Sequence, residues 1–260
     1  DTAGFVQGTG TSVSTGSNPY SLTGLTANTS YDFYVQADCG ADSSTWAGPY
    51  SITTLCNAIS AFPYTEDFDG AWPNCWTIVN KDADGYTWTQ DDTYITPHSG
   101  AWTAHGMGNQ DDYLISPQLT LSAGLELKWW DVVESASYNN TYNVLLSTTT
   151  SDTAAFTVNL GTYDCTNISW AEYSIDLSAY SGQSVYISFH QTYSASTFYG
   201  FGIDDVSVSE MPACLDPSAL RDTNLTTTSV DLKWTENGTA TTWNIEWDTA
   251  GFVQGTGNIV

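Results

Sequence analysis

The chain has 260 residues, and its four Lys and Arg against 29 Asp and Glu give a formal net charge of −25. So few cations cannot build the basic surface that nucleic acids or anionic membranes require, which excludes both as partners. No run of about 18 apolar residues could span a membrane, and 11 Trp and 16 Tyr exclude a disordered chain. The first residues are not a signal peptide, so the chain is expected to be mature or cut from a longer protein.

Alternation of apolar and polar residues with a period of two predicts an all-β protein. The pattern is clear in Leu125–Trp129, in Val185–Phe189 and in Val230–Trp234, and turn-forming clusters lie at 181–183 and 236–238. Thr, Val, Tyr and Trp, which favour strands, are abundant. We therefore expect antiparallel sandwiches or jelly rolls.

The two ends of the sequence repeat each other. Asp1–Gly10 recurs letter for letter as Asp248–Gly257. This predicts a tandem array with a period of about 247 residues, which is far too long for a solenoid repeat and indicates whole domains.

Joining the ends produces a recognisable module. Residues 214–257 followed by 11–56 resemble a complete fibronectin type III domain, with Val230–Trp234 and Thr242–Trp247 as its strands B and C. In the same alignment Leu25–Tyr31 is similar to the tyrosine corner of that family, in which the Tyr31 hydroxyl would bond to upstream backbone.

This resemblance implies a division into three parts. Residues 1–55 would be the C-terminal half of one fibronectin type III domain, and residues 211–260 would be the N-terminal half of the next. Residues 56–210 would form a second kind of module between them. A fibronectin type III module implies a spacer or interaction role.

Five motifs in the middle module occur in an order that resembles the cleaved-adhesin, or choice-of-anchor J, domain. That family is a MAM-like jelly roll in large secreted surface proteins of Bacteroidota, where it alternates with fibronectin type III repeats. The resemblance implies adhesion or fibre building. The motifs are Phe62–Gly70, Trp72–Trp76, Asp82–Trp88, Gln110–Pro117 and Tyr199–Val206.

The cysteines agree with an exported protein. None has zinc-ligand spacing, and disulfides are typical of secreted chains. The resemblance implies that Cys56 pairs with Cys75 at the start of the jelly roll. In the rejoined fibronectin module, Cys214 and Cys39 lie at one pole and would pair between adjacent units, which leaves Cys165 buried and free.

Acidic clusters indicate calcium. The first and last strands of a jelly roll lie side by side, so carboxylates at its two ends can converge, and calcium binds six to eight oxygens. Solvated loop carboxylates are the alternative. Asp82 and Asp84 also resemble a short calcium loop without its full pattern. The predicted ligands are Glu66, Asp67, Asp69, Asp111, Asp112, Asp204 and Asp205.

Tryptophans and threonines supply further candidate sites. Trp130, Trp88 and Trp72 could stack on sugars if exposed, with core packing as the alternative. Trp130 is the first candidate, because it follows Trp129 on a strand and one of the two must point outward. The Asp-Thr-Ala triplets resemble an O-glycosylation signal of Bacteroidota and give Thr2, Thr153 and Thr249 as candidates.

No catalytic motif emerges: the sequence has no nucleophile elbow and no phosphate loop. We therefore expect a non-enzymatic repeat unit of a long extracellular adhesin or surface filament. Its partners would be neighbouring copies of the repeat, with glycans or surface polymers as ligands. The alternatives are a carbohydrate-binding accessory module of a secreted hydrolase and a purely structural filament.

Overall fold

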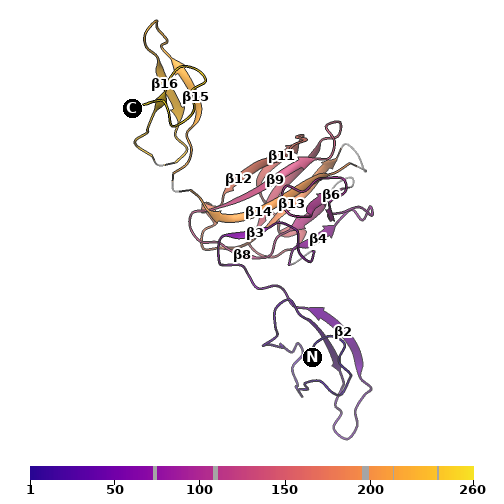
Figure 1. The fold of residues 1–260 in the computed structure, drawn as a ribbon. Helices are drawn as coiled ribbons and strands as arrows, with labels where there is room; N and C mark the ends of the chain where they lie inside the picture. Colours follow the sequence, from indigo (N-terminus) through magenta and orange to yellow (C-terminus); the bar gives the residue numbers. More distant parts are fainter. Residues whose placement is uncertain (73–74, 108–110, 195–198, 213, 239) are drawn as a thin grey trace. The chain divides into compact units, whose positions relative to one another are not determined.

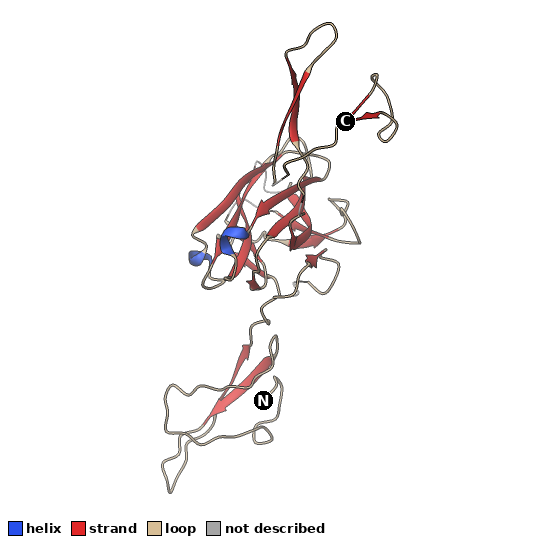
Figure 2. Ribbon diagram, turned by 90° about the vertical axis from the view of Figure 1, so that its left-hand side faces the viewer, coloured by secondary structure: helices blue, strands red, loops and turns tan. Residues whose placement is uncertain are grey.

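A computed structural model of the chain describes all residues except 73–74, 108–110, 195–198, 213 and 239. The chain divides into two compact units, Asp1–Glu210 and Met211–Val260. Within the described residues, helix is confined to the short 3₁₀ turns η1 (Thr153–Ala155) and η2 (Ser178–Tyr180). All the other regular elements are strands (Figures 1 and 2), which confirms the all-β class.

Two six-stranded antiparallel sheets form the middle module. The first has the order β11-β10-β13-β7-β4, with β8 also paired to β13. It contains β4 (Thr77–Asn80), β7 (Asp112–Ile115), β8 (Leu119–Thr120), β10 (Asn140–Ser147), β11 (Val158–Cys165) and β13 (Ser184–Ser194).

The second sheet has the order β12-β9-β14-β6-β5, with β3 also paired to β14. It contains β3 (Tyr64–Glu66), β5 (Thr89–Asp91), β6 (Thr103–Gly106), β9 (Leu125–Val133), β12 (Ala171–Asp176) and β14 (Phe201–Glu210).

The predicted alternation puts one face of each sheet into a shared core. Leu125, Leu127 and Trp129 of β9 are fully buried. From the other sheet, Phe189 of β13 meets the Trp129 ring with centroids 5.6 Å apart. Burial of this many large apolar side chains is the main favourable term in the folding free energy of the module.

A hydrogen-bonded chain of side chains crosses this core. Trp129 Nε1 donates to the Tyr142 hydroxyl at 2.8 Å, and that hydroxyl donates to Asp131 Oδ2 at 2.8 Å. Burial raises the pKa of Asp131 to about 6, against the opposing effect of the Tyr142 hydrogen bond. These two bonds pair the Trp129 N–H, the Tyr142 hydroxyl and Asp131 Oδ2, which would otherwise be costly in an apolar interior.

The N-terminal segment carries a two-stranded sheet of β1 (Ser30–Val35) and β2 (Ala47–Thr53). The Tyr31 hydroxyl accepts a hydrogen bond from the Thr26 amide at 2.9 Å. This is the bond to upstream backbone that the tyrosine-corner motif predicts.

The C-terminal unit contains two small sheets. One pairs β15 (Ser218–Thr223) with β16 (Asp231–Thr235), and the other pairs β17 (Glu246–Trp247) with β18 (Asn258–Ile259). The assignment of the terminal segments as halves of fibronectin type III domains stays a prediction, as does the three-part domain division.

The duplicated ends share one local conformation. Thr9 donates its amide and its hydroxyl to the Val6 carbonyl, and Thr256 does the same to the Val253 carbonyl. The glycines at equivalent places, such as Gly8 and Gly255, have φ of +92° and +90°. The repeated sequence therefore folds into the same turn in both places.

Candidate functional site

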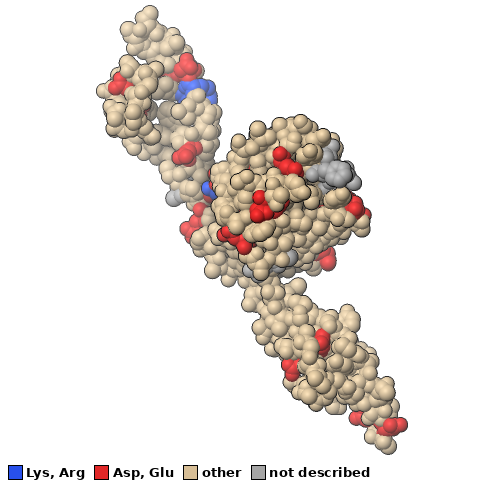
Figure 3. All heavy atoms as spheres, turned by 45° about the vertical axis from the view of Figure 1, so that its right-hand side comes forward, with Lys and Arg blue, Asp and Glu red and all other residues tan. Residues whose placement is uncertain are grey.

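Charge alone does not locate a site, because acidic side chains are scattered over the face shown in Figure 3. As expected, the first and last strands of the jelly roll are neighbours, since β3 pairs with β14 and Glu66 lies opposite Val206. The carboxylate of Glu66 accepts a hydrogen bond from the Phe68 amide at 3.0 Å, and that of Asp67 accepts one from the Asp69 amide at 3.1 Å. Both carboxylates thus hold the turn after β3.

Asp69 in turn holds the loop at residues 98–102. Its Oδ1 accepts hydrogen bonds from the amides of Ala101 and Trp102 at 2.6 and 2.8 Å. Gly100 has φ of +62°, and a Cβ there would overlap the Asp69 carboxylate. The close approach of this carboxylate therefore requires glycine at that position.

Asp204 and Asp205 hold the other end of the same loop. Asp204 Oδ2 accepts a hydrogen bond from the His98 amide at 2.8 Å. Asp205 binds His98 Nδ1 at 2.5 Å and the Ser99 hydroxyl at 2.7 Å. Burial raises the pKa of Asp204 to about 7. Of the expected convergent ligands, Asp69, Asp204 and Asp205 thus bind the backbone and side chains of one loop.

Asp111 and Asp112 are adjacent in sequence but face different surroundings. Asp111 contacts Lys81 Nζ at 3.1 Å and His190 Nε2 at 2.9 Å, and the His190 ring also stacks on Tyr113. His190 Nε2 is thus paired with Asp111, whereas its buried Nδ1 has no hydrogen-bond partner among the described residues. Asp111 already has cationic or hydrogen-bonding partners.

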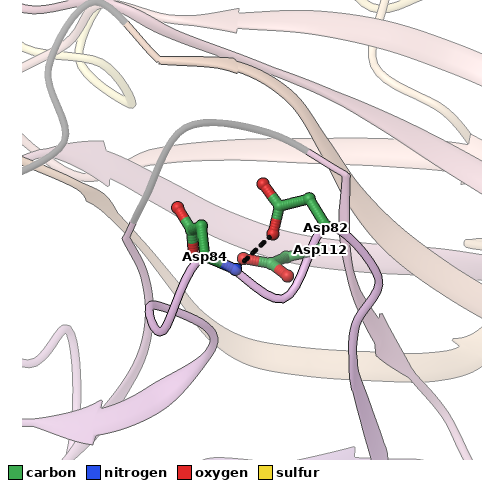
Figure 4. Close-up of side chains that lie close together, drawn as sticks. All are labelled: Asp82, Asp84 and Asp112. Carbon is green, nitrogen blue, oxygen red and sulfur yellow. Dashed lines mark hydrogen bonds between the residues drawn. The ribbon is translucent and has the colours of Figure 1, made fainter.

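Asp112 lies beside the two carboxylates of the short loop after β4. Ligand-type oxygens of Asp82, Asp84 and Asp112 all lie within 4.8 Å of one another, and this is the one such acidic group found in the described part of the chain. Figure 4 shows the carboxylates of Asp82 and Asp84 on the same side as that of Asp112. Burial and the charges of Asp82, Asp84 and Asp111 raise the pKa of Asp112 to about 7. Of the seven predicted ligands, Asp112 alone belongs to this group.

Trp130 points away from the core, as its place after Trp129 predicts, and is half-buried. One face of its ring is covered by His98, with the two rings nearly parallel and their centroids 4.0 Å apart. Trp170 also contacts His98, at 5.7 Å and a steep angle. The sequence held no signal for this stack, because His98 and Trp130 lie on different elements.

Two of the predicted sugar-stacking tryptophans pack inside the module. Trp88 is 1% exposed and meets Phe201 edge-on at 5.2 Å, so the prediction that it binds a ligand is wrong. Trp72 is partly buried, and its ring packs edge-on against Phe68 at 5.1 Å as part of the core. Core packing accounts for both residues. The exposed aromatic side chains among the described jelly-roll residues are Tyr94, Trp102, Tyr193 and Tyr199.

A second buried polar group surrounds His105 on β6. Its Nε2 lies 3.6 Å from Glu134 Oε2 and its Nδ1 lies 3.9 Å from Asp91 Oδ2. Burial lowers the pKa of His105, and its side chain is 1% exposed. Solvent does not reach this imidazole, and its Nε2 has no hydrogen-bond partner among the described residues.

The cysteines and threonines have the following environments. Cys56 and Cys75 form a disulfide with a Cα–Cα separation of 5.9 Å. Cys39 and Cys214 are free and exposed, and Cys165 is free and buried. Thr2 and Thr249 are exposed and Thr153 is half-buried; their glycosylation stays a prediction.

Two antiparallel sheets packed around an aromatic core define a β-sandwich module. The family model of the Cleaved Adhesin Domain matches residues 62–208. The chain belongs to this family.

Similar proteins come from Porphyromonas gingivalis. The chain is 31% identical over 196 residues to a hemagglutinin A, an alignment that covers 64% of this chain and 7% of that protein. It is 30% identical over 107 residues to Lys-gingipain W83, covering 35% of this chain and 6% of that protein. The chain thus spans under a tenth of the length of these two relatives.

The fold has a solved counterpart. The crystal structure of the K1 cleaved adhesin domain of Lys-gingipain from strain W83 matches with a TM-score of 0.51 and 24% identity. The match covers 58% of this chain and 100% of that domain. This likeness supports the fold of the middle module. In the described part of the chain, no helix has the length and apolar character needed to cross a membrane.

Proposed function

We propose that this chain is a repeat unit of a long extracellular adhesin or surface filament, in which neighbouring copies complete each other. Membership of the Cleaved Adhesin Domain family supports an adhesive module. The disulfide between Cys56 and Cys75 supports an oxidising, extracellular location. Adhesion requires no catalysis, so the module is a non-enzymatic part of the larger protein.

The main support for a repeat unit is that apolar side chains in the terminal segments are exposed. In β1 and β2, Phe33 lies opposite Tyr50 and Tyr31 lies opposite Ile52, so one face of the sheet is apolar. Phe33, Tyr50 and Ile52 are nevertheless exposed. A two-stranded sheet with a bare apolar face is marginal by itself.

The C-terminal unit also exposes apolar side chains. Val230, Leu232 and Trp234 alternate along the strand, and both Val230 and Leu232 are exposed. Trp243, which packs against Trp234 at 5.3 Å, is also exposed. The identical turns at Asp1–Gly10 and Asp248–Gly257 make the two ends equivalent parts of successive repeats. The C-terminal face of one copy therefore packs on the N-terminal face of the next.

Sedimentation velocity tests this arrangement on the full chain. We expect concentration-dependent association of the wild type and its loss in Leu232→Asp, which puts a charge on the apolar face. Leu225→Asp is the matched control, because Leu225 is exposed in the connection between β15 and β16 and its change should leave association intact. A wild type that stays monomeric at every concentration would contradict the proposal.

Glycans or surface polymers are the ligands that this adhesin would bind, through the half-exposed Trp130 and its His98 partner. Trp130 is half-buried with one ring face against His98, and a partly exposed indole can stack on a sugar. A carbohydrate-binding accessory module of a secreted hydrolase is the second candidate on the same observation. Binding to a glycan array that Trp130→Ala abolishes would support a sugar ligand, and unchanged binding would remove Trp130 from the site.

A further inference from the structure

The first residues of the chain form a short extra strand along one edge of β1. Thr2 lies opposite Tyr31 in an antiparallel bridge. Asp1 and Asp32 exchange both of their backbone hydrogen bonds, at 3.2 and 3.0 Å. Beyond Asp32 this edge of β1 is unpaired among the residues that the structure describes, because the other edge alone pairs with β2.

The duplicated sequence defines how this extra strand continues in a repeat. Asp1–Gly10 is identical to Asp248–Gly257, and the segment directly before the second copy is Thr242–Trp247, which contains β17. Aligning the two copies therefore makes Thr242–Trp247 the backward extension of the strand that pairs with β1.

The register follows by counting along the two strands in opposite directions from the pairs that the structure shows. Trp247 comes opposite Phe33, and Ile245 comes opposite Val35. Residues directly opposite each other in an antiparallel pair share a face. All four side chains are apolar, and Phe33, Val35 and Trp247 are exposed. This register continues the apolar face of β1 onto β17, whereas a slip by one residue would turn the apolar side chains of β17 to the other face.

The backbone hydrogen bonds of both strands agree with this register. Ile245 exchanges its two backbone hydrogen bonds with Val260, at 3.0 and 2.8 Å, on the β18 side of β17. Glu246 therefore presents its N–H and C=O to the other edge, which has no paired strand in the described residues. On β1, Asp32 bonds to the extra strand, so Tyr34, two residues on, faces the same edge. The register puts Glu246 opposite Tyr34, where their backbone groups can pair.

The duplicated turn gives an independent check. In its first copy, Phe5 meets the Tyr34 ring edge-on at 5.5 Å. In its second copy, the amides of Gly255 and Gly257 donate to the Glu246 carboxylate at 2.8 and 2.6 Å. The two turns have the same sequence and conformation. A single turn that contacts both Tyr34 and Glu246 puts these side chains on one face, as the register requires.

We propose that β17 of one copy adds to the open edge of β1 in the next, with Trp247 opposite Phe33 and Ile245 opposite Val35. This pairing rests on the association of copies proposed above, and it names the strands and the register that join them. The joined sheet has the order β18-β17-β1-β2. Its four strands exceed the two-stranded sheets that are marginal by themselves.

The pairing exchanges identical segments between copies. The chain runs on from β17 into Asp248–Gly257, which therefore takes the place on β1 that Asp1–Gly10 holds in the next copy. The Ala250 amide then donates to the Ser30 carbonyl, as the Ala3 amide does at 2.9 Å. Asp1–Gly10 is thus a competitor of the incoming strand for the edge of β1.

Cysteine cross-linking tests the register on the full chain, with the free Cys39 and Cys214 replaced by Ser. One copy carries Val35→Cys and the other carries Ile245→Cys. The register makes them a non-hydrogen-bonded pair with Cα atoms about 4.5 Å apart, which a disulfide can join. Asn244→Cys is the matched control, because Asn244 is exposed and lies one residue out of register. It should link to Val35→Cys at least about tenfold more slowly than Ile245→Cys does.

Proline at the duplicated alanines supplies a second test without new cysteines. Ala3 and Ala250 each precede a turn glycine, Gly4 or Gly251, with φ of +87° or +93°. Proline fits this place in a turn and removes the amide N–H. Ala250→Pro should weaken association about two- to tenfold, because it deletes one hydrogen bond to the Ser30 carbonyl of the next copy. Ala3→Pro should not weaken association, because it impairs only the competing segment.

Sedimentation velocity of the same mixtures separates the two proposals. The register is overturned if the copies associate but Val35→Cys links to Asn244→Cys, or to a second Val35→Cys, as fast as to Ile245→Cys. Equal weakening of association by Ala3→Pro and Ala250→Pro would overturn it as well. In both cases the association of copies stands, whereas a wild type that never associates contradicts both proposals.

Discussion

Replacing Tyr142 with Phe removes a single oxygen atom from the centre of the jelly roll. That hydroxyl accepts the Trp129 indole N–H and donates to Asp131, each at 2.8 Å. The variant strands a buried donor and a buried carboxylate, and each stranded group costs about 1–3 kcal/mol. We therefore expect the free energy of unfolding to fall by about 2–6 kcal/mol.

The cost depends on pH, which separates this mechanism from a general loss of packing. Burial raises the pKa of Asp131 to about 6, so its carboxylate is charged at pH 8 and largely neutral at pH 5. A neutral carboxyl tolerates the loss of the Tyr142 donor better than a charged one does. The destabilisation by Tyr142→Phe should accordingly be larger at pH 8 than at pH 5.

Urea denaturation followed by tryptophan fluorescence at both pH values provides the measurement. Tyr94→Phe is the control, because Tyr94 is exposed and its change should alter stability by no more than about 0.5 kcal/mol. A Tyr142→Phe variant within 1 kcal/mol of the wild type, or one whose cost is the same at both pH values, would refute the reasoning.

Three further outcomes are expected. The Asp131 pKa is raised in the folded state, so the stability that its bound proton contributes is present below about pH 4 and is lost as the pH rises through about 6. Asp131→Asn should therefore flatten that part of the pH–stability curve measured by urea titration. Replacing Cys56 and Cys75 with Ser opens a loop of sequence separation 19 and should lower stability by about 3 kcal/mol in calorimetry, whereas an unchanged melting temperature would show that the disulfide is dispensable. Gly200→Ala puts a Cβ against the Gly106 carbonyl oxygen and the His105 ring and should lower the melting temperature, and a variant as stable as the wild type would mean that both the backbone and the ring move aside freely.

The sandwich was predictable because alternation is a local property of each strand. Leu125, Leu127 and Trp129 are buried as their spacing indicates, and the outward position of Trp130 follows from the same period. The tyrosine corner at Tyr31 was likewise carried by a short stretch of sequence.

The site was less predictable, because it depends on where loops run. Asp69 and Asp205 are acidic in sequence like Asp112, yet they bind the 98–102 loop, whose path no local pattern records. The sequence does not distinguish a buried tryptophan from an exposed one, and only the fold puts Trp88 against Phe201. The proximity of Asp112 to Asp82 likewise arises from the pairing of β4 with β7, far apart in sequence.

Disulfide cross-linking of Cys39 and Cys214, which are both free and exposed, would test directly whether neighbouring copies pair. A mixture of light and nitrogen-15-labelled chains, oxidised mildly at high concentration and digested, would be examined by mass spectrometry. Packing of the C-terminal face of one copy on the N-terminal face of the next predicts Cys39–Cys214 peptides that join a light chain to a heavy one, lost in Cys214→Ser. Cross-links only within single chains, or random pairing of each cysteine with itself, would contradict the proposed array.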